Sequence, residues 1–107
     1  MEEEYYENGN PKRIVFEDSA DGTYSENIYY ENGDLEYSRN ESPEQILEEW
    51  YDEEGYRTYF NHKNADFEIE MTADSNGKLE RVIENGTEIE DPAILAQYAS
   101  GYHFRQE

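Results

Sequence analysis

The sequence contains no cysteine, few basic residues and no long hydrophobic run. Without cysteine there is no disulfide framework, no thiolate metal site and no cysteine nucleophile. A membrane-spanning helix needs about 20 consecutive apolar residues, and no comparable run occurs among these 107 residues. The segment Met1-Glu2-Glu3-Glu4 is the opposite of a basic secretory leader, so we expect a cytoplasmic protein.

The charge balance is strongly negative, with 28 Asp and Glu against 8 Lys and Arg and a formal net charge of −20. Nucleic acids and anionic membranes carry the same sign, so neither is expected as a direct partner. Small soluble domains usually carry a net charge of about 2–8 in magnitude. Because the excess costs folding stability through self-repulsion, it points to a role in binding a basic protein surface.

Aromatic residues argue against the disorder that so acidic a composition usually indicates. The chain has 11 Tyr, 4 Phe and 1 Trp, and such rings bury enough apolar area to support a small core. The length allows one domain, so we treat residues 1–107 as a single unit. We expect most tyrosines to be structural and the others to contribute to a protein interface.

A short aromatic motif repeats along the chain. Tyr-Tyr-Glu-Asn-Gly at residues 5–9 returns at 29–33, with looser copies at 50–55 and 71–77. The four glycines are separated by 24, 22 and 22 residues. An Asn-Gly turn with a strand on either side forms a β-hairpin, and a period of about 22 residues accommodates two strands and two turns. The pattern predicts a mainly β fold, an antiparallel meander of about eight strands built from four hairpin repeats over residues 5–86.

The register of these hairpins is open. In the fourth hairpin, a three-residue loop places Ile69 opposite Ile83 on an apolar side. In the second hairpin, a two-residue Asn-Gly loop places Ile28 opposite Tyr37 instead. These two loop lengths imply that one turn type does not serve both hairpins, and a slip of one residue exchanges the faces of a strand.

Two further segments carry helix signals. The sequence Ser42-Pro43-Glu44-Gln45 matches a helix start, and the apolar residues after it have helical spacing. The repeat alignment instead makes residues 46–51 the first strand of the third hairpin, so both structures stay open for 43–51, with the strand favoured. At the end of the chain, Asp91-Pro92 followed by an apolar segment and Gly101 predicts a short helix over 92–100. This helix is expected to cover one end of the sheet.

The Tyr-Tyr-Glu-Asn-Gly units at 5–9 and 29–33, with the variant at 50–55, resemble the MORN-repeat variant family, which includes antitoxin components. More distantly they are similar to the YD repeats of Rhs-type proteins. The resemblance covers residues 5–86 and implies a hairpin-repeat fold. It also implies a function as an antitoxin or immunity protein that neutralises a cognate toxin. Family members typically carry Lys and Gly where this chain has Glu and Asp.

No constellation of catalytic residues is apparent. The two histidines, His62 and His103, belong to no Ser-His-Asp order, and there is no nucleophile elbow or glycine-rich phosphate loop. With 28 acids, pairs of carboxylates occur almost anywhere and indicate nothing about acid–base chemistry. We therefore expect a non-enzymatic protein without a cofactor.

Acids flank several glycines, as they do in calcium-binding loops. An EF-hand loop places Gly at its sixth position and Glu at its twelfth. With Gly77 at the sixth position the twelfth is Ile83, and with Gly22 it is Ile28. Both alignments fail, so no specific metal site is expected.

The acids themselves suggest a function. Alternate residues of a strand lie ~6.7 Å apart on one face, and neighbouring strands lie ~4.8 Å apart. A sheet can therefore present negative oxygens at a density approaching that of duplex DNA, which carries one charge per ~1.7 Å of axis. The expected array consists of Glu26, Glu36, Glu48, Glu68, Glu70, Glu80 and Glu84.

This array leads to the main hypothesis, an acidic nucleic-acid mimic that blocks the basic groove of a nuclease or another nucleic-acid-binding protein. Anti-CRISPR and anti-restriction proteins of phages act in this way, in the cytoplasm of a bacterial host cell. The alternatives are the antitoxin or immunity protein implied by the resemblance, and a structural repeat module without a dedicated target. The expected contact residues are Glu48, Glu49, Trp50, Tyr51, Asp52, Glu53, Glu54, Tyr59, Asp66, Glu68 and Glu70.

Overall fold

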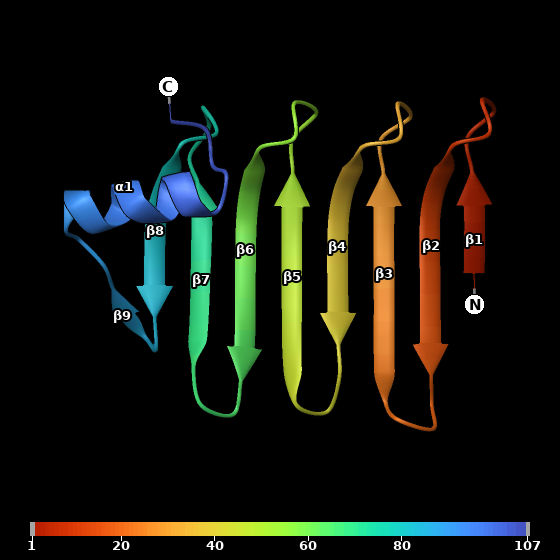
Figure 1. Cartoon of the computed structure of the whole chain (residues 1–107), viewed down its shortest axis with the longest axis horizontal. Coiled ribbons are helices and arrows are strands. Elements are labelled where there is room, and N and C mark those ends of the chain that lie inside the picture. Colours follow the sequence, from red (N-terminus) through yellow and green to blue (C-terminus); the bar gives the residue numbers. More distant parts are fainter. Residues whose placement is uncertain (1, 107) are drawn as a thin grey trace.

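Nine antiparallel strands form a single sheet in which each strand pairs with the next one in sequence (Figure 1). The computed structural model describes residues 2–106. Its elements are β1 (Glu2–Tyr5), β2 (Pro11–Asp18), β3 (Thr23–Tyr29), β4 (Leu35–Glu41), β5 (Gln45–Tyr51), β6 (Arg57–Asn64), β7 (Glu68–Ala73), β8 (Leu79–Glu84), β9 (Thr87–Glu88) and α1 (Pro92–Gly101). The predicted antiparallel meander with a short C-terminal helix is confirmed, and the two-residue β9 extends it by one strand.

The four turns that contain the repeat glycines share one conformation. They link β1 to β2, β3 to β4, β5 to β6 and β7 to β8 (Figure 1). In each turn the glycine N–H donates to the carbonyl three residues earlier, and that earlier residue's N–H donates to the carbonyl after the glycine, at 2.7–3.1 Å. This pattern makes a three-residue hairpin loop whose last residue has φ > 0. The glycines that supply this conformation, with φ from 85° to 98°, are Gly9, Gly33, Gly55 and Gly77.

A register shift of one residue follows each of these turns. The shift leaves one residue of each returning strand without a partner, at Lys12, Glu36, Thr58 and Glu80. A bulge of this kind adds a residue to one strand and increases the local twist. The repeat is therefore a hairpin with a three-residue loop and a bulge at the same place.

The bulge explains which register predictions succeed. Ile28 pairs with Tyr37, as the two-residue loop predicted, although the loop has three residues. Ile69 pairs with Glu84 and not with Ile83, because the bulge at Glu80 adds one residue to β8 after the three-residue loop. The prediction that one turn type does not serve both hairpins was wrong, since all four hairpins use the same turn and the same bulge.

Residues 43–51 form a turn and a strand, which decides between the two structures left open above. The Ser42 N–H donates to the Gln45 carbonyl at 2.9 Å, and the Ser42 Oγ accepts from the Gln45 N–H at 3.3 Å. Ser42 thus closes a tight turn between β4 and β5. Its hydroxyl accepts from a backbone N–H here just as a serine does at the start of a helix, so the same residues fit both structures. The turn between β6 and β7 likewise closes with the Asn64 N–H donating to the Phe67 carbonyl at 2.9 Å.

The core lies between α1 and the end of the sheet formed by β6 to β8. Phe60, Met71 and Val82 from the strands pack with Ala99 and Phe104, and all five are buried. In Figure 1, α1 crosses β7 and β8 on one face of the sheet. Within residues 2–106 no helix has the length and hydrophobicity that a membrane crossing needs.

The ends of α1 follow the sequence signals closely. The Asp91 carboxylate accepts from the Ala93 N–H at 2.9 Å and caps the first turn, directly before Pro92. At the other end, the helix includes Gly101, and the residue with φ > 0 is His103, at 58°. The helix predicted over 92–100 is thus confirmed, and the chain reverses two residues later than expected.

Arg57 fastens the C-terminal segment to the sheet. Its guanidinium donates to the Tyr102 carbonyl, to the Glu49 carboxylate at 3.3 Å and to the Tyr51 hydroxyl at 3.1 Å. The Arg57 N–H also donates to the His103 carbonyl at 2.9 Å. The side chains of Arg57 and Glu49 are only 17% and 13% exposed. This pair is largely desolvated, so each charge depends on the other.

A candidate protein-binding face

The two faces of the sheet differ in chemistry. α1 packs on the face that carries Phe60, Met71 and Val82. On the opposite face, which we call the acidic face, one row of cross-strand neighbours runs through all nine strands. Every second strand of this row carries a glutamate: Glu2, Glu26, Glu48, Glu70 and Glu88. Neighbouring glutamates of the row are therefore about 9.6 Å apart across two strand spacings.

This glutamate row follows from the repeat. Each of its first four members stands seven residues before a turn glycine, so the spacing of the glycines fixes the spacing of the acids. The array predicted from the sequence included Glu26, Glu48 and Glu70 but did not reflect that they occupy the same position of the hairpin repeat. Aligning the repeats on their glycines would have shown this. The separation of about 9.6 Å exceeds the Debye length of about 8 Å at physiological salt, which limits repulsion along the row.

Arginines and tyrosines hold the carboxylates of the row in place. Arg13 contacts Glu26 at 2.7 Å, and Arg39 contacts Glu48 at 3.0 Å. The Tyr37 hydroxyl donates to Glu48 at 2.5 Å. These contacts fix the direction of each carboxylate and neutralise part of its charge.

Glu70 has a different environment from the other inner members of the row. The Tyr59 hydroxyl donates to it at 2.8 Å, and within residues 2–106 no Lys, Arg or His forms an ion pair with it. Glu68, two residues away on β7, shares this face and is exposed. Glu70 therefore keeps more of its negative charge than Glu26 and Glu48, while Glu68 has Lys63 as its cross-strand partner on β6.

An aromatic row lies beside the acids. Tyr37, Trp50 and Tyr59 are cross-strand partners on β4, β5 and β6. The rings of Tyr37 and Trp50 pack with their centroids 4.3 Å apart, while Trp50 remains 40% exposed. An exposed tryptophan between carboxylates is the type of residue that dominates binding energy in protein interfaces.

The predicted contact residues separate into groups. Five lie together on the acidic face over β5 to β7: Glu48, Trp50, Tyr59, Glu68 and Glu70. Glu49 and Tyr51 point to the opposite face, where they contact Arg57. Asp52, Glu53 and Glu54 form the β5–β6 turn, and Asp66 lies in the β6–β7 turn at the other end of the strands.

The predicted array also divides between the faces. Glu84 lies on the face covered by α1, where it accepts from the Tyr98 hydroxyl at 3.0 Å. Glu36 and Glu80 are the unpaired residues of two bulges. The other four members, Glu26, Glu48, Glu68 and Glu70, share the acidic face. Alternation alone does not reveal this division, because each bulge changes the face of the residues after it.

Residues 2–106 offer no grouped metal ligands. Among the described residues, no set of three or more His, Asp or Glu side chains is placed to hold one ion. The two histidines have different neighbours. His62 forms a hydrogen bond with Gln45, and His103 stacks on the ring of Tyr56.

The tyrosines on the acidic face predict a stability change at high pH. Burial, and then the hydrogen bond to Glu48, raises the pKa of Tyr37 to about 12, and burial with the bond to Glu70 likewise raises the pKa of Tyr59. Below pH ~10 both the folded and unfolded states keep these protons, so the stabilisation is complete. Between pH ~10 and ~12 only the unfolded state loses them, so the free energy of unfolding should fall. Urea titrations across this range should show a shallower fall for Tyr37→Phe/Tyr59→Phe, and equal slopes would contradict this assignment.

The chain matches no protein-family model, no curated protein and no solved structure. The resemblance of the Tyr-Tyr-Glu-Asn-Gly units to the MORN-repeat variant family therefore stays a prediction. The features that mark the candidate face are that no helix among residues 2–106 covers it, that it carries an ordered row of carboxylates, and that Trp50 is exposed on it.

Proposed function

We propose that this protein is a non-enzymatic inhibitor that uses its acidic face to occupy a basic surface on which another protein holds nucleic acid. The observation that carries the proposal is the glutamate row, which places a carboxylate on every second strand. Among residues 2–106, no helix or strand packs over this face (Figure 1). It is free to meet a partner along its whole length.

The dimensions of the row fit this role. The row crosses nine strands and therefore spans eight strand spacings, a length of about 38 Å. This is close to the ~34–36 Å length of one turn of duplex DNA. The molecule extends 43 Å along its longest axis. A basic groove that follows one turn of a duplex can therefore contact the complete row.

The centre of the contact is the group on β5 to β7 comprising Glu48, Trp50, Tyr59, Glu68 and Glu70. The acids supply charge complementarity, which raises the association rate and selects basic partners. Trp50 supplies an apolar anchor that charge alone does not give. In the β5–β6 turn at the edge of this surface, Asp52 and Glu54 are ion-paired with Arg105 at 3.2 and 3.0 Å, so they add less charge to it.

The test is capture from a bacterial lysate by the immobilised chain, with the retained proteins identified by mass spectrometry. The proposal predicts nucleic-acid-binding proteins that are released by duplex DNA or RNA but not by an uncharged polymer, and that are lost as salt rises towards about 1 M. A captured protein that stays bound near about 1 M salt and is not displaced by either nucleic acid would sink the proposal.

The second candidate is an antitoxin or immunity protein. It is favoured by the four hairpins with one shared turn, which carry the motif on which the family resemblance rests. In that case the chain should rescue cells that express a toxin encoded beside its own gene, and nucleic acid should not compete with the toxin. A chain that captures no protein would instead be a structural repeat module.

A further inference from the structure

The face opposite the acidic face is open over its N-terminal half. In Figure 1, α1 lies over β7 and β8, and nothing lies in front of β2 to β5. We call this open area the neutral patch. The register places eight side chains at its centre: Ile14, Phe16, Ser25, Asn27, Tyr29, Ser38, Asn40 and Leu47. Thr23, Leu35 and Gln45 continue it at the ends of the strands.

None of these eight side chains is charged, in a chain whose net charge is −20. On the acidic face the same strands carry glutamates in cross-strand register, such as Glu26 and Glu48. Three acids border the patch: Glu3 is exposed on β1 beside Ile14, Asp18 ends β2, and Glu49 is paired with Arg57. The neutral patch is therefore the part of the sheet that another anion can approach with least repulsion.

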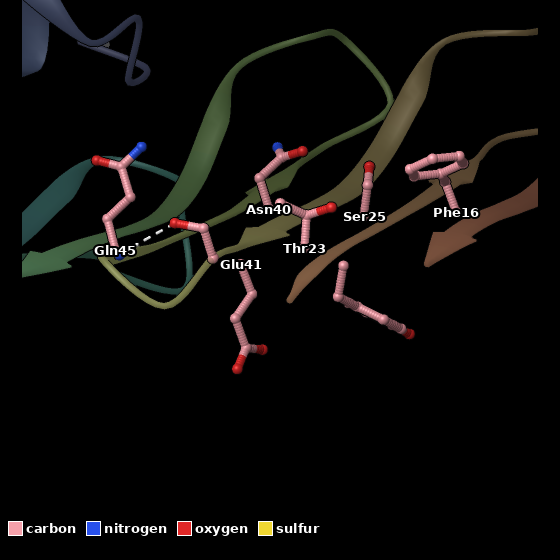
Figure 2. A pocket seen from close by; sticks show the side chains of 8 residues that line it. Phe16, Thr23, Ser25, Asn40, Glu41 and Gln45 are labelled. Atoms are coloured by element: carbon pink, nitrogen blue, oxygen red, sulfur yellow. Dashed lines mark hydrogen bonds between the residues drawn. The ribbon is translucent and has the colours of Figure 1, made fainter. Parts of the chain in front are cut away.

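The patch exposes apolar as well as polar groups. Phe16 is 48% exposed, and with Ser25, Asn40 and Gln45 it lines a shallow hollow of about 170 Å³. Figure 2 shows these four side chains standing on the same side of the sheet. Leu47 packs against the core beneath α1, so the patch continues the surface that the helix covers further along the sheet.

We propose that a second copy of the chain covers the neutral patch, giving a back-to-back dimer with both acidic faces outward. Two molecules of charge −20 repel, and on this surface the nearest carboxylates, Glu3, Asp18 and Glu49, lie at the margins and not among the eight central side chains. Its hydroxyls and amides each donate and accept hydrogen bonds, so two identical patches can pair across a two-fold axis. The proposal is independent of the function proposed above.

The size of the patch makes the dimer weak. Four strands at ~4.8 Å spacing and about 20 Å long cover ~400 Å² per copy, so the dimer buries about 800 Å², less than the ~1,200–2,000 Å² of stable interfaces. Salt should strengthen it, because screening removes the repulsion between the two copies. This salt dependence is opposite in sign to that expected for a basic partner, so the two proposals can fail separately.

The test is sedimentation equilibrium of the whole chain at low salt and at about 0.5 M NaCl, where the Debye length is well below 8 Å. At high salt and protein concentrations towards the millimolar range, the average mass should rise from 12.7 kDa towards twice that value. Phe16→Glu/Asn27→Asp should lower the association constant about tenfold or more, because like charges then meet across the axis. Ser75→Glu/Asn76→Asp adds the same charge in the exposed β7–β8 turn and is the matched control.

A monomer at every salt and protein concentration overturns the dimer, as does self-association that the patch variant and the turn control change equally. Asn40→Asp repeats the test with a single charge at an exposed side chain, if the double variant unfolds. Far-UV circular dichroism and the urea midpoint establish that each variant keeps the fold.

Discussion

Replacing Glu68 and Glu70 together with lysine is expected to lower the affinity for the captured basic protein about 100-fold or more. Both carboxylates lie on the acidic face of β7. The change of four charges sets lysines against a basic surface, and such like-charge contacts cost several kcal/mol. The fold should persist, because the net charge becomes less negative. The local losses are the hydrogen bond from Tyr59 to Glu70 and the opposite charges of the cross-strand partners Lys63 and Glu68.

The matched control for this prediction is Glu7→Lys/Glu31→Lys. These two acids are exposed in the β1–β2 and β3–β4 turns, and the variant changes the net charge by the same amount. Its affinity should fall less than about tenfold, through long-range attraction alone. If both double variants lose affinity equally, the partner responds to total charge and not to the acidic face.

Arg57→Met is expected to cost about 3–5 kcal/mol of folding stability, since breaking a buried ion pair leaves the other charge uncompensated. In this protein the remaining charge is the Glu49 carboxylate, and the C-terminal segment also loses the hydrogen bond to its Tyr102 carbonyl. The measurement is the free energy of unfolding from urea titration. A second variant, Arg57→Met/Glu49→Leu, should recover part of the loss, because an apolar replacement of a complete buried pair is often nearly neutral.

The control for Arg57 is Arg81→Met. Arg81 and Glu88 form an exposed pair at 3.4 Å on β8 and β9, and exposed pairs contribute about 0–1 kcal/mol. If Arg57→Met costs no more than Arg81→Met, then Arg57 does not hold the C-terminal segment to the sheet.

The period of the glycines predicted the fold correctly because each hairpin is a local structure, closed by its own turn. The register could not be predicted in the same way. A residue in a bulge looks like any other strand residue in sequence, and Glu36 and Glu80 alternate with their neighbours as though the ladder were continuous. At Ser42-Pro43, the same hydrogen-bonding residues serve a helix start and a tight turn, so local sequence alone did not distinguish them.

The candidate site depended on the register and was therefore only partly predicted. The acidic run from Glu48 to Glu54 reads as one surface in sequence, but Glu48 and Trp50 face one way while Glu49 and Tyr51 face the other. The role of Arg57 was missed because its contacts with Tyr102 join residues 45 positions apart. No local pattern indicates such a contact. The glutamate row, in contrast, could have been predicted, because its first four members recur at one position of the repeat.

The central claim is that the acidic face and nucleic acid compete for one basic surface. The most direct measurement is the dissociation constant between this protein and its purified captured partner at increasing concentrations of duplex DNA or RNA. The account predicts that the apparent dissociation constant rises linearly with the concentration of free nucleic acid. A constant that does not change while the partner is saturated with nucleic acid would contradict it.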